Sequence, residues 1–297
     1  MFTGSIPALV TPFASDRSFD EPAYRDFIEW QIAEGSSGLV ACGTTGEAAT
    51  LSYDEHFHVV RVCVDQARGR VPVIAGAGSN DTRVAANNLR AAKDAGADAV
   101  LMVPPYYNRP GQEGIFQHFA ALGESAPLPI ILYNVPSRTV TDIQPATLER
   151  IVAAYPAIFV GVKDASGVLA RVSQHRAACG ADFVQLSGND DLALAFNAMG
   201  GVGCISVSAN VAPRLCAEFQ AACQAGDFVK ALGYQDRLYP LHDALFTDAS
   251  PGPVKYAMTK MREGFPGTLR LPMTPASEVS RAAVDAALKH ASLLPSG

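Results

Sequence analysis

Eight short apolar runs, spaced roughly 25 to 35 residues apart over the first three quarters of the chain, constrain its fold more than any other feature. Each run is rich in β-branched residues and gives way to Gly, Pro, Ser, Thr or Asn, which is typical of a strand followed by a turn. Segments with helical periodicity, such as 56–67 and 83–97, lie between the runs. The eight runs cover residues 5–10, 38–43, 71–78, 99–107, 129–136, 159–166, 183–190 and 201–210.

These runs are continuously apolar and do not alternate with polar residues, which indicates strands covered on both faces, as in a parallel sheet. Eight strand–helix units in about 210 residues match the arithmetic of a (β/α)8 barrel. The competing fold is a doubly wound open sheet, but no G-x-G-x-x-G motif opens the first helix. We therefore predict an α/β protein in which residues 1–224 form a (β/α)8 TIM barrel.

The last quarter of the chain contains no strand-like run. Three of its segments show helical periodicity, and Ser277 followed by Glu278 is a helix-capping pattern at the start of the last one. We predict that residues 225–297 form a C-terminal helical region, which serves as a packing or oligomer element.

Composition and charge exclude several classes of protein. The net charge of −6 argues against binding to nucleic acid or to an anionic membrane surface. No apolar run approaches the roughly 18 residues of a membrane-spanning helix, and the first residues lack the features of a signal peptide. The six cysteines form no C-x-x-C pair, and no His, Asp or Glu cluster has metal-ligand spacing. We expect reduced thiols, no metal site and a cytoplasmic protein.

Functional residues of such a barrel lie at the carboxyl ends of its strands. Of the six lysines, only Lys163 falls inside a predicted strand. Burial lowers the pKa of a lysine and makes a neutral amine available, which can condense with a ketone to form a Schiff base. The alternative is a structural lysine paired with a carboxylate of a neighbouring strand.

Hydroxyl groups close several of the other strands. Tyr133, Thr44, Thr45 and one of the adjacent Tyr106 and Tyr107 are candidates for a chain that relays protons to an imine. Tyrosines at strand ends are also commonly packing residues of the rim. Which of the two adjacent tyrosines takes part is left open.

Two further features suit a substrate that carries a carboxylate. The turn 44–47 has the pattern of a helix start whose exposed amides face an anion. Arg138 offers a guanidinium for bidentate binding, although an arginine at this place is equally compatible with the surface. Gly200–Gly203 fits a tight turn better than a phosphate site.

Four segments occur together and in order, namely G-T-T-G-E at 43–47, P-Y-Y-N-R-P at 105–110, Y-N-V-P-S-R-T at 133–139 and V-K-D-A-S-G at 162–167. Together they resemble the dihydrodipicolinate synthase family of pyruvate-dependent class I aldolases, and the likeness runs nearly end to end. The resemblance implies a lyase that condenses pyruvate with L-aspartate 4-semialdehyde to 4-hydroxy-tetrahydrodipicolinate, in diaminopimelate and lysine biosynthesis. It also implies a homotetramer built as a dimer of dimers.

The resemblance assigns roles to individual residues. It implies that Lys163 forms the Schiff base with pyruvate, without a metal or an organic cofactor. Tyr133, Thr44 and Tyr107 would relay protons, with Tyr107 supplied by the neighbouring subunit. The substrate-binding residues that it implies are Thr45 for the pyruvate carboxylate, Arg138 for the semialdehyde carboxylate, and Gly188 and Ile205 around the lysine.

Regulation is where the sequence departs from the pattern of lysine-inhibited relatives. Val84 stands where such members usually carry a glutamate, and Tyr53 where they often carry a histidine. Without the carboxylate, the ammonium group of lysine lacks its partner, so we predict weak or absent inhibition. The residues that do match this allosteric site are Ala49, His56, Asn80 and Tyr106.

Two other interpretations are weighed against this one. The first is another pyruvate-yielding aldolase or a keto-acid dehydratase on the same scaffold. Arg138 argues against it, since we do not expect S-R-T after the Y-N-x-P of those relatives. The second is a barrel that binds a metabolite without turnover. Loss of Lys163 or Tyr133 would mark such a protein, and both residues are present.

Overall fold

The structure, a computed structural model, describes residues 2–295. Its eight strands are all parallel and follow one another around a single sheet in the order β1-β8-β7-β6-β5-β4-β3-β2. Each predicted run coincides with one strand that is shorter than the run, and only β1 extends beyond its run, beginning one residue earlier at Gly4. The strands are β1 (Gly4–Pro7), β2 (Leu39–Ala41), β3 (Val73–Gly76), β4 (Ala99–Met102), β5 (Ile130–Asn134), β6 (Phe159–Asp164), β7 (Val184–Ser187) and β8 (Gly203–Ser206).

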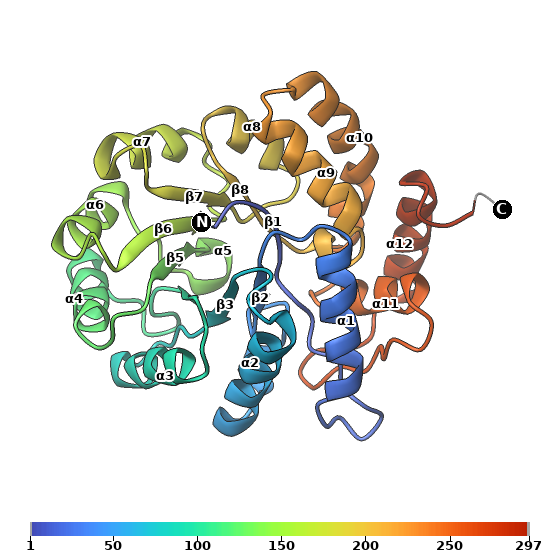
Figure 1. The fold of residues 1–297 in the computed structure, drawn as a ribbon, viewed down its shortest axis with the longest axis horizontal. Coiled ribbons are helices and arrows are strands. Elements are labelled where there is room, and N and C mark those ends of the chain that lie inside the picture. Colours follow the sequence, from blue (N-terminus) through green and yellow to red (C-terminus); the bar gives the residue numbers. More distant parts are fainter. Residues whose placement is uncertain (1, 296–297) are drawn as a thin grey trace.

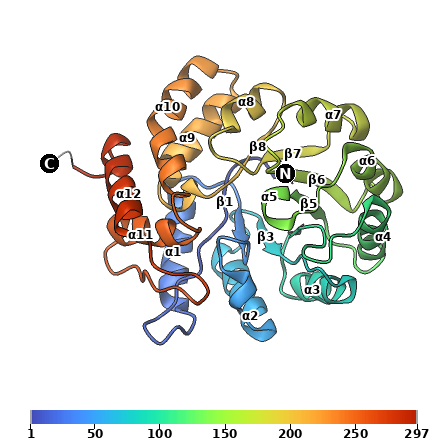
Figure 2. The ribbon, with the colours of Figure 1, turned by 180° about the vertical axis from the view of Figure 1, so that it is seen from behind.

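The two ends of this sheet meet just beyond β1. Ala8 forms a parallel bridge with Val40 of β2, and the Leu9 amide donates to the Val40 carbonyl at 2.9 Å. The sheet is therefore a barrel, which confirms the predicted TIM-barrel fold and excludes the open doubly wound sheet. Figures 1 and 2 show the helices that surround it from opposite sides.

Two apolar layers account for the continuous apolar runs. Alternate strand residues such as Ile6, Ile74 and Ile131 pack inside the barrel. Their neighbours along the strands, such as Leu39 and Leu132, pack outward against the helices. Because both faces of each strand are covered, neither face needs polar residues.

Helices follow the strands around the outside of the barrel (Figure 1). Side-chain caps help to define where several of them begin; Asp81, for example, accepts hydrogen bonds from the amides of Arg83 and Val84. The helices of the barrel are α1 (Glu21–Ala33), α2 (Tyr53–Ala67), α3 (Thr82–Asp94), α4 (Gln112–Gly123), α5 (Pro136–Thr139), α6 (Pro145–Ala154), α7 (Ala170–Cys179), α8 (Ala193–Ala198) and α9 (Pro213–Gln224), with short 3-10 turns η1 (Ala48–Thr50) and η2 (Ser208–Asn210).

Three more helices follow α9, as predicted: α10 (Phe228–Ala244), α11 (Gly252–Met261) and α12 (Glu278–His290). They lie on the side of the barrel formed by α1, α8 and α9 (Figures 1 and 2). Ser277 caps α12 by accepting a hydrogen bond from the Ser280 amide, which confirms the predicted helix start. The division of the chain at residue 224 stays a prediction.

None of the helices within residues 2–295 is both long enough and apolar enough to cross a membrane. In the same part of the chain, no group of three or more His, Cys, Asp or Glu side chains is arranged to hold a metal ion.

Candidate active site

A cavity of about 1100 Å³ opens at the carboxyl ends of the strands. The turn after β2 forms one side of it, called here the first wall. The segment after β5 that carries Arg138 forms another side, the second wall. The predicted site residues that line the cavity are Lys163, Tyr133, Thr44, Thr45, Arg138 and Gly188. Six residues from the ends of four strands, β2, β5, β6 and β7, are thus brought to one space.

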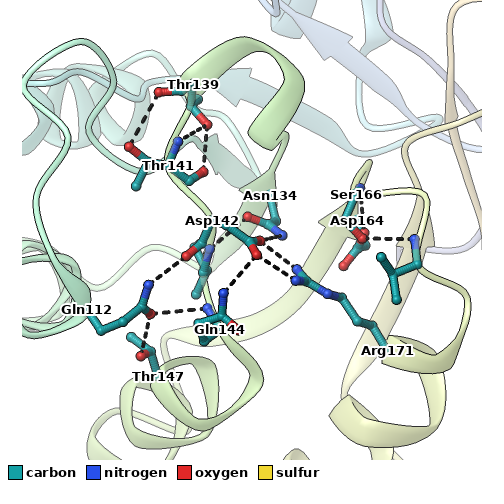
Figure 3. A network of polar contacts seen from close by, with 12 residues as sticks. Gln112, Asn134, Thr139, Thr141, Asp142, Gln144, Thr147, Asp164, Ser166 and Arg171 are labelled. Carbon is teal, nitrogen blue, oxygen red and sulfur yellow. Dashed lines mark hydrogen bonds and ion pairs between the residues drawn. The ribbon is translucent and has the colours of Figure 1, made fainter.

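Lys163 and Tyr133 are direct neighbours on β6 and β5. The Lys163 ammonium nitrogen lies 4.2 Å from the centroid of the Tyr133 ring, and both side chains are almost completely buried. Lys163 lines the cavity, whereas the next residue, Asp164, points away from it and accepts a hydrogen bond from the Ser166 amide (Figure 3). The alternation of side chains along β6 therefore presents the amine to the cavity.

The turn 43–47 presents Thr44 and Thr45 to the same cavity. The Gly46 and Glu47 amides donate to the carbonyls of Gly43 and Thr44, at 3.1 Å each. Gly46 packs so closely on the barrel that a Cβ atom there would lie 2.9 Å from the Leu9 carbonyl oxygen. A side chain at residue 46 would displace the turn, so glycine is required by the close approach of two backbones.

The prediction that residues 44–47 start a helix is wrong. Glu47 has φ 54° and precedes only the three-residue turn η1, to which its side chain offers no cap. The following helix, α2, begins at Tyr53 and is capped by Ser52. The left-handed backbone of Glu47 ends the turn before a helix can form, and Glu47 is almost completely buried.

Glu47 is held by residues of the C-terminal region. Its Oε1 lies 2.6 Å from the Lys255 Nζ, and its Oε2 accepts from the Arg270 amide at 3.0 Å. Lys255, on α11, is fully buried, donates to the Thr268 carbonyl at 2.7 Å and lies over the Phe13 ring. Burial lowers the pKa of Lys255 to about 8, although Glu47 opposes this shift.

Sequence reasoning missed Lys255. It lies between Val254 and Ala257 on a helix that is otherwise apolar at its buried positions, and this pattern is a weak signal for a buried charge. Its partner Glu47 was visible in the G-T-T-G-E segment. Nothing local connects the two, because the contact joins the barrel to the far end of the chain.

Arg270 joins the same cluster from the segment between α11 and α12. Its guanidinium makes two 2.6 Å contacts with the Glu55 carboxylate and lies over the Phe13 ring, with the guanidinium carbon 4.1 Å from the centroid. It also donates to the carbonyls of Arg17 and Thr50. Phe13 is thus in contact with two cations, Lys255 and Arg270, that belong to the C-terminal region.

The other wall carries Arg138 on the short helix α5. The chain leaves this helix through Thr139, whose hydroxyl donates to the carbonyls of Val135 and Thr141. The Thr141 hydroxyl in turn donates to the Pro105 carbonyl, after β4. Figure 3 shows this turn above a second network of polar contacts.

That second network centres on Asp142. The Arg171 guanidinium on α7 binds its carboxylate in bidentate fashion, at 2.7 and 2.6 Å. The Asn134 amide nitrogen, at the end of β5, donates to the same carboxylate at 2.8 Å, while its carbonyl oxygen accepts from the Ile143 amide (Figure 3). The Arg171 guanidinium lowers the pKa of Asp142. Sequence reasoning missed this pair as well.

The adjacent tyrosines 106 and 107 occupy different environments. Tyr106 lines the cavity and is partly exposed. Tyr107 has φ 69°, is 90% exposed and does not line the cavity of its own chain.

The cavity lining includes three of the four residues predicted to form an allosteric site. Ala49, His56 and Tyr106 line it together with Val84 and Tyr53, whereas Asn80 does not. The His56 Nε2 lies 2.7 Å from the Gly76 carbonyl, and burial lowers the pKa of this imidazole. Position 84 of this lining carries no carboxylate.

Two further residues lie near the cavity: Ile205, which was predicted from the sequence, and His242, which was not. Ile205 is fully buried in the inner apolar layer with Tyr133 and does not line the cavity. His242 of α10 lines it, with its Nδ1 at 2.7 Å from the Ser208 hydroxyl, and was not singled out from the sequence. Burial lowers the pKa of His242.

Comparison with known proteins identifies what the chain is similar to. A sequence model described as the Dihydrodipicolinate synthetase family matches residues 1–291. Two curated proteins named 4-hydroxy-tetrahydrodipicolinate synthase, from Rhizorhabdus wittichii and Novosphingobium aromaticivorans, are 65% and 61% identical; each alignment covers 99% of this chain and 100% or 99% of the relative. The crystal structure of the chloride-inhibited dihydrodipicolinate synthase from Acinetobacter baumannii, complexed with pyruvate, is 41% identical with a TM-score of 0.94, over 99% of this chain and all of that one.

Proposed function

Because the chain belongs to the dihydrodipicolinate synthetase family, we propose that it catalyses the condensation of pyruvate with L-aspartate 4-semialdehyde to 4-hydroxy-tetrahydrodipicolinate. This is a lyase reaction of diaminopimelate and lysine biosynthesis. The observation that carries the proposal is the buried Lys163 amine against the Tyr133 ring, at the base of a cavity walled by hydroxyl groups and Arg138.

Catalysis begins with covalent capture of pyruvate. The Lys163 amine attacks the ketone carbon, and loss of water from the carbinolamine forms an imine. The hydroxyls of Tyr133 and Thr44 face this carbon and pass the protons that the addition and the dehydration require. Tyr107 of a neighbouring subunit completes the relay, consistent with its exposure on its own chain.

The carbon–carbon bond forms from the imine. Removal of a proton from the methyl group yields an enamine, whose carbon attacks the aldehyde of the second substrate. The amino group of that substrate then attacks the imine carbon, which closes the ring and releases Lys163. The protonated imine itself accepts the electron pair of the broken C–H bond, so we propose that neither a metal nor an organic cofactor takes part.

Two groups that bind carboxylates orient the substrates. Thr45 holds the carboxylate of pyruvate on the first wall of the cavity, and Arg138 holds that of the semialdehyde on the second. Gly188 lines the cavity beside the lysine and leaves no room for a side chain of its own, because a Cβ atom there would lie 2.6 Å from that of Ala165. Ile205 packs behind the reacting lysine in the inner layer.

We further propose that the enzyme is a homotetramer, a dimer of dimers, in which pairs of subunits exchange Tyr107. In this arrangement Tyr106 faces the cavity of its own chain, and Ala49, His56 and Asn80 border an allosteric site close to the subunit interface.

The proposed reaction is tested by measuring pyruvate consumption with and without aspartate 4-semialdehyde, coupled to a reductase that takes the cyclic product. We expect turnover that requires both substrates and falls by more than about 10⁴-fold in Lys163→Ala. Lys93→Ala, which removes an exposed lysine of α3, serves as the control and should leave turnover unchanged.

Borohydride trapping with pyruvate separates the alternatives. A pyruvyl adduct on Lys163 without turnover of the semialdehyde would contradict the substrate assignment and indicate a sister aldolase. The absence of both turnover and adduct would contradict the catalytic role of Lys163 and favour a barrel that only binds a metabolite.

A further inference from the structure

A fully buried ion pair links the first wall of the cavity to the C-terminal region. The side chains of Lys255 and Glu47 are 0% and 1% exposed, and they meet at 2.6 Å. Such a pair is a weak source of stability, because removing two charges from water offsets most of their attraction. Apolar residues of similar volume would hold the turn 43–47 against α11 equally well, so the charges have a role other than stability.

We propose that Lys255 and Glu47 are positioning residues, through which the C-terminal region places the hydroxyls of Thr44 and Thr45 in the active site. The inference rests on the proposed function of the cavity. It gives residues beyond the barrel a part in the reaction, although neither charged group of the pair touches the reacting atoms.

The contacts of Glu47 are suited to this task. Glu47 is the last residue of the turn 43–47, and its amide donates to the Thr44 carbonyl. Its backbone at φ 54° is in the left-handed region, which a non-glycine residue occupies only when its surroundings hold it there. Both carboxylate oxygens are held, one by Lys255 and one by the Arg270 amide. A displacement of this carboxylate therefore moves the turn.

The barrel holds the turn from the opposite side. The Thr11 hydroxyl, after β1, donates to the Gly46 carbonyl at 2.7 Å. The turn is thus held between the barrel and the C-terminal region. Loss of the second support leaves Thr44 and Thr45 free to move by a fraction of an ångström, and a misplacement of about 1 Å lowers a rate by about 10²-fold.

The second wall has separate supports. Arg138 depends on the segment that Asp142, Asn134 and Arg171 hold, and none of these three contacts α11 or the segment 262–276 through the hydrogen bonds and ion pairs of residues 2–295. Loss of the Lys255–Glu47 pair should therefore change the use of pyruvate and leave the KM for the semialdehyde unchanged. A general loss of folding would change both.

The test compares Lys255→Met, Glu47→Gln and the double variant Glu47→Gln/Lys255→Met. Lys255→Met leaves a buried carboxylate without its partner, so we expect Tm to fall and kcat/KM for pyruvate to fall about 10²-fold. The double variant has no charge at positions 47 and 255, and its Tm should return toward that of the wild type. Its kcat/KM for pyruvate should stay at least about tenfold below the wild-type value, because the ionic link to the turn is still missing.

Glu47→Asp provides a second route if Lys255→Met does not fold. It keeps the charge and shortens the side chain by one methylene, so we expect a lower kcat with little change in Tm. Glu113→Gln, which removes the partner of Arg150 in an exposed ion pair, is the matched control and should change neither quantity.

A double variant that recovers kcat together with Tm would overturn the proposal, and so would wild-type kcat in Glu47→Asp. Borohydride trapping keeps this test separate from the proposed function. Every folded variant should still form the pyruvyl adduct on Lys163, whereas failure of the wild-type enzyme to form it would contradict the proposed function itself.

Discussion

The two walls of the cavity are held by charged pairs that differ in burial and in their distance along the chain. Asp142 and Arg171 lie 29 residues apart, and their side chains are 29% and 10% exposed. Glu47 and Lys255 are at most 1% exposed, and the other bond to Glu47, from Arg270, spans 223 residues. The Asp142–Arg171 pair of the second wall is local and partly exposed to water. The Glu47–Lys255 pair of the first wall joins distant parts of the chain and is shielded from water.

This difference indicates how each wall responds to change. Partly exposed ions keep some of their hydration, so the loss of one partner leaves the other in contact with water. A fully buried ion without its partner has no such compensation. We therefore expect the wall that carries Arg138 to tolerate damage better than the wall that carries Thr44 and Thr45.

Among the changes that test this comparison of the walls, the largest effect is expected at Arg138, the proposed binding group for the semialdehyde carboxylate. Arg138→Ala removes the guanidinium that we propose binds the semialdehyde carboxylate, so kcat/KM for this substrate should fall about 10²-fold or more. Formation of the Schiff base with pyruvate should change little. Steady-state kinetics measures the use of the semialdehyde, and borohydride trapping measures the formation of the Schiff base. Equal losses in both would contradict the proposal that each wall binds a different substrate.

The pH dependence of kcat tests the role of Lys255 at the first wall. Lys255 faces Glu47 and Arg270, and Arg270 is itself paired with Glu55. As pH rises through about 8, Lys255 loses its proton and the link to the turn weakens, so kcat should fall. The double variant Glu47→Gln/Lys255→Met should not show the decrease in kcat that the deprotonation of Lys255 causes. Identical pH profiles of kcat for the wild type and the double variant would refute the role of Lys255 in this decrease.

Stability should respond in the opposite direction over the same pH range. The pKa of Lys255 is about 8 in the folded protein and lies near its ordinary value of 10.5 in the unfolded chain. Between these values the unfolded chain binds more protons, so the contribution of this lysine to the free energy of unfolding rises with pH. Thermal unfolding at pH 7.5 and 9.5, compared between wild type and Lys255→Met, isolates this contribution.

A smaller effect is expected from the support of the second wall. Arg171→Met removes the bidentate partner of Asp142 but leaves the hydrogen bonds from Asn134 and Gln144 in place. The KM for the semialdehyde should rise roughly threefold to tenfold through the altered placement of Arg138, and the KM for pyruvate should not change. A larger rise in the KM for pyruvate would show that the walls are coupled.

The smallest effect is expected for added lysine. Val84, which lines the cavity together with His56 and Tyr106, offers no carboxylate to an ammonium group. Millimolar lysine should therefore leave the initial rate nearly unchanged. Val84→Glu is the informative variant, because restored inhibition would assign the missing response to this position, whereas strong inhibition of the wild-type enzyme would contradict the prediction.

The fold was predictable because its signals are local. A strand covered on both faces must be apolar throughout, so each of the eight runs marks one strand, and the Ser277 cap marks a helix start within a few residues. Lys163 was identified for the same reason, as a charged residue inside an apolar run. The strand ends then indicated Tyr133, Thr44 and Arg138, which the structure brings to one cavity.

Only the tertiary structure decided which distant residues meet. The amino-acid pattern alone predicted a helix start at 44–47, because it does not reveal the left-handed backbone of Glu47. It also left Tyr106 and Tyr107 equivalent, whereas the backbone turns one into the cavity and exposes the other. Lys255 carried no local signal, since the free energy of a buried charge depends on the partner that the fold brings to it. The sequence by itself determined the barrel and the lysine inside its sixth strand, and the folded chain decided what holds the surrounding hydroxyls in place.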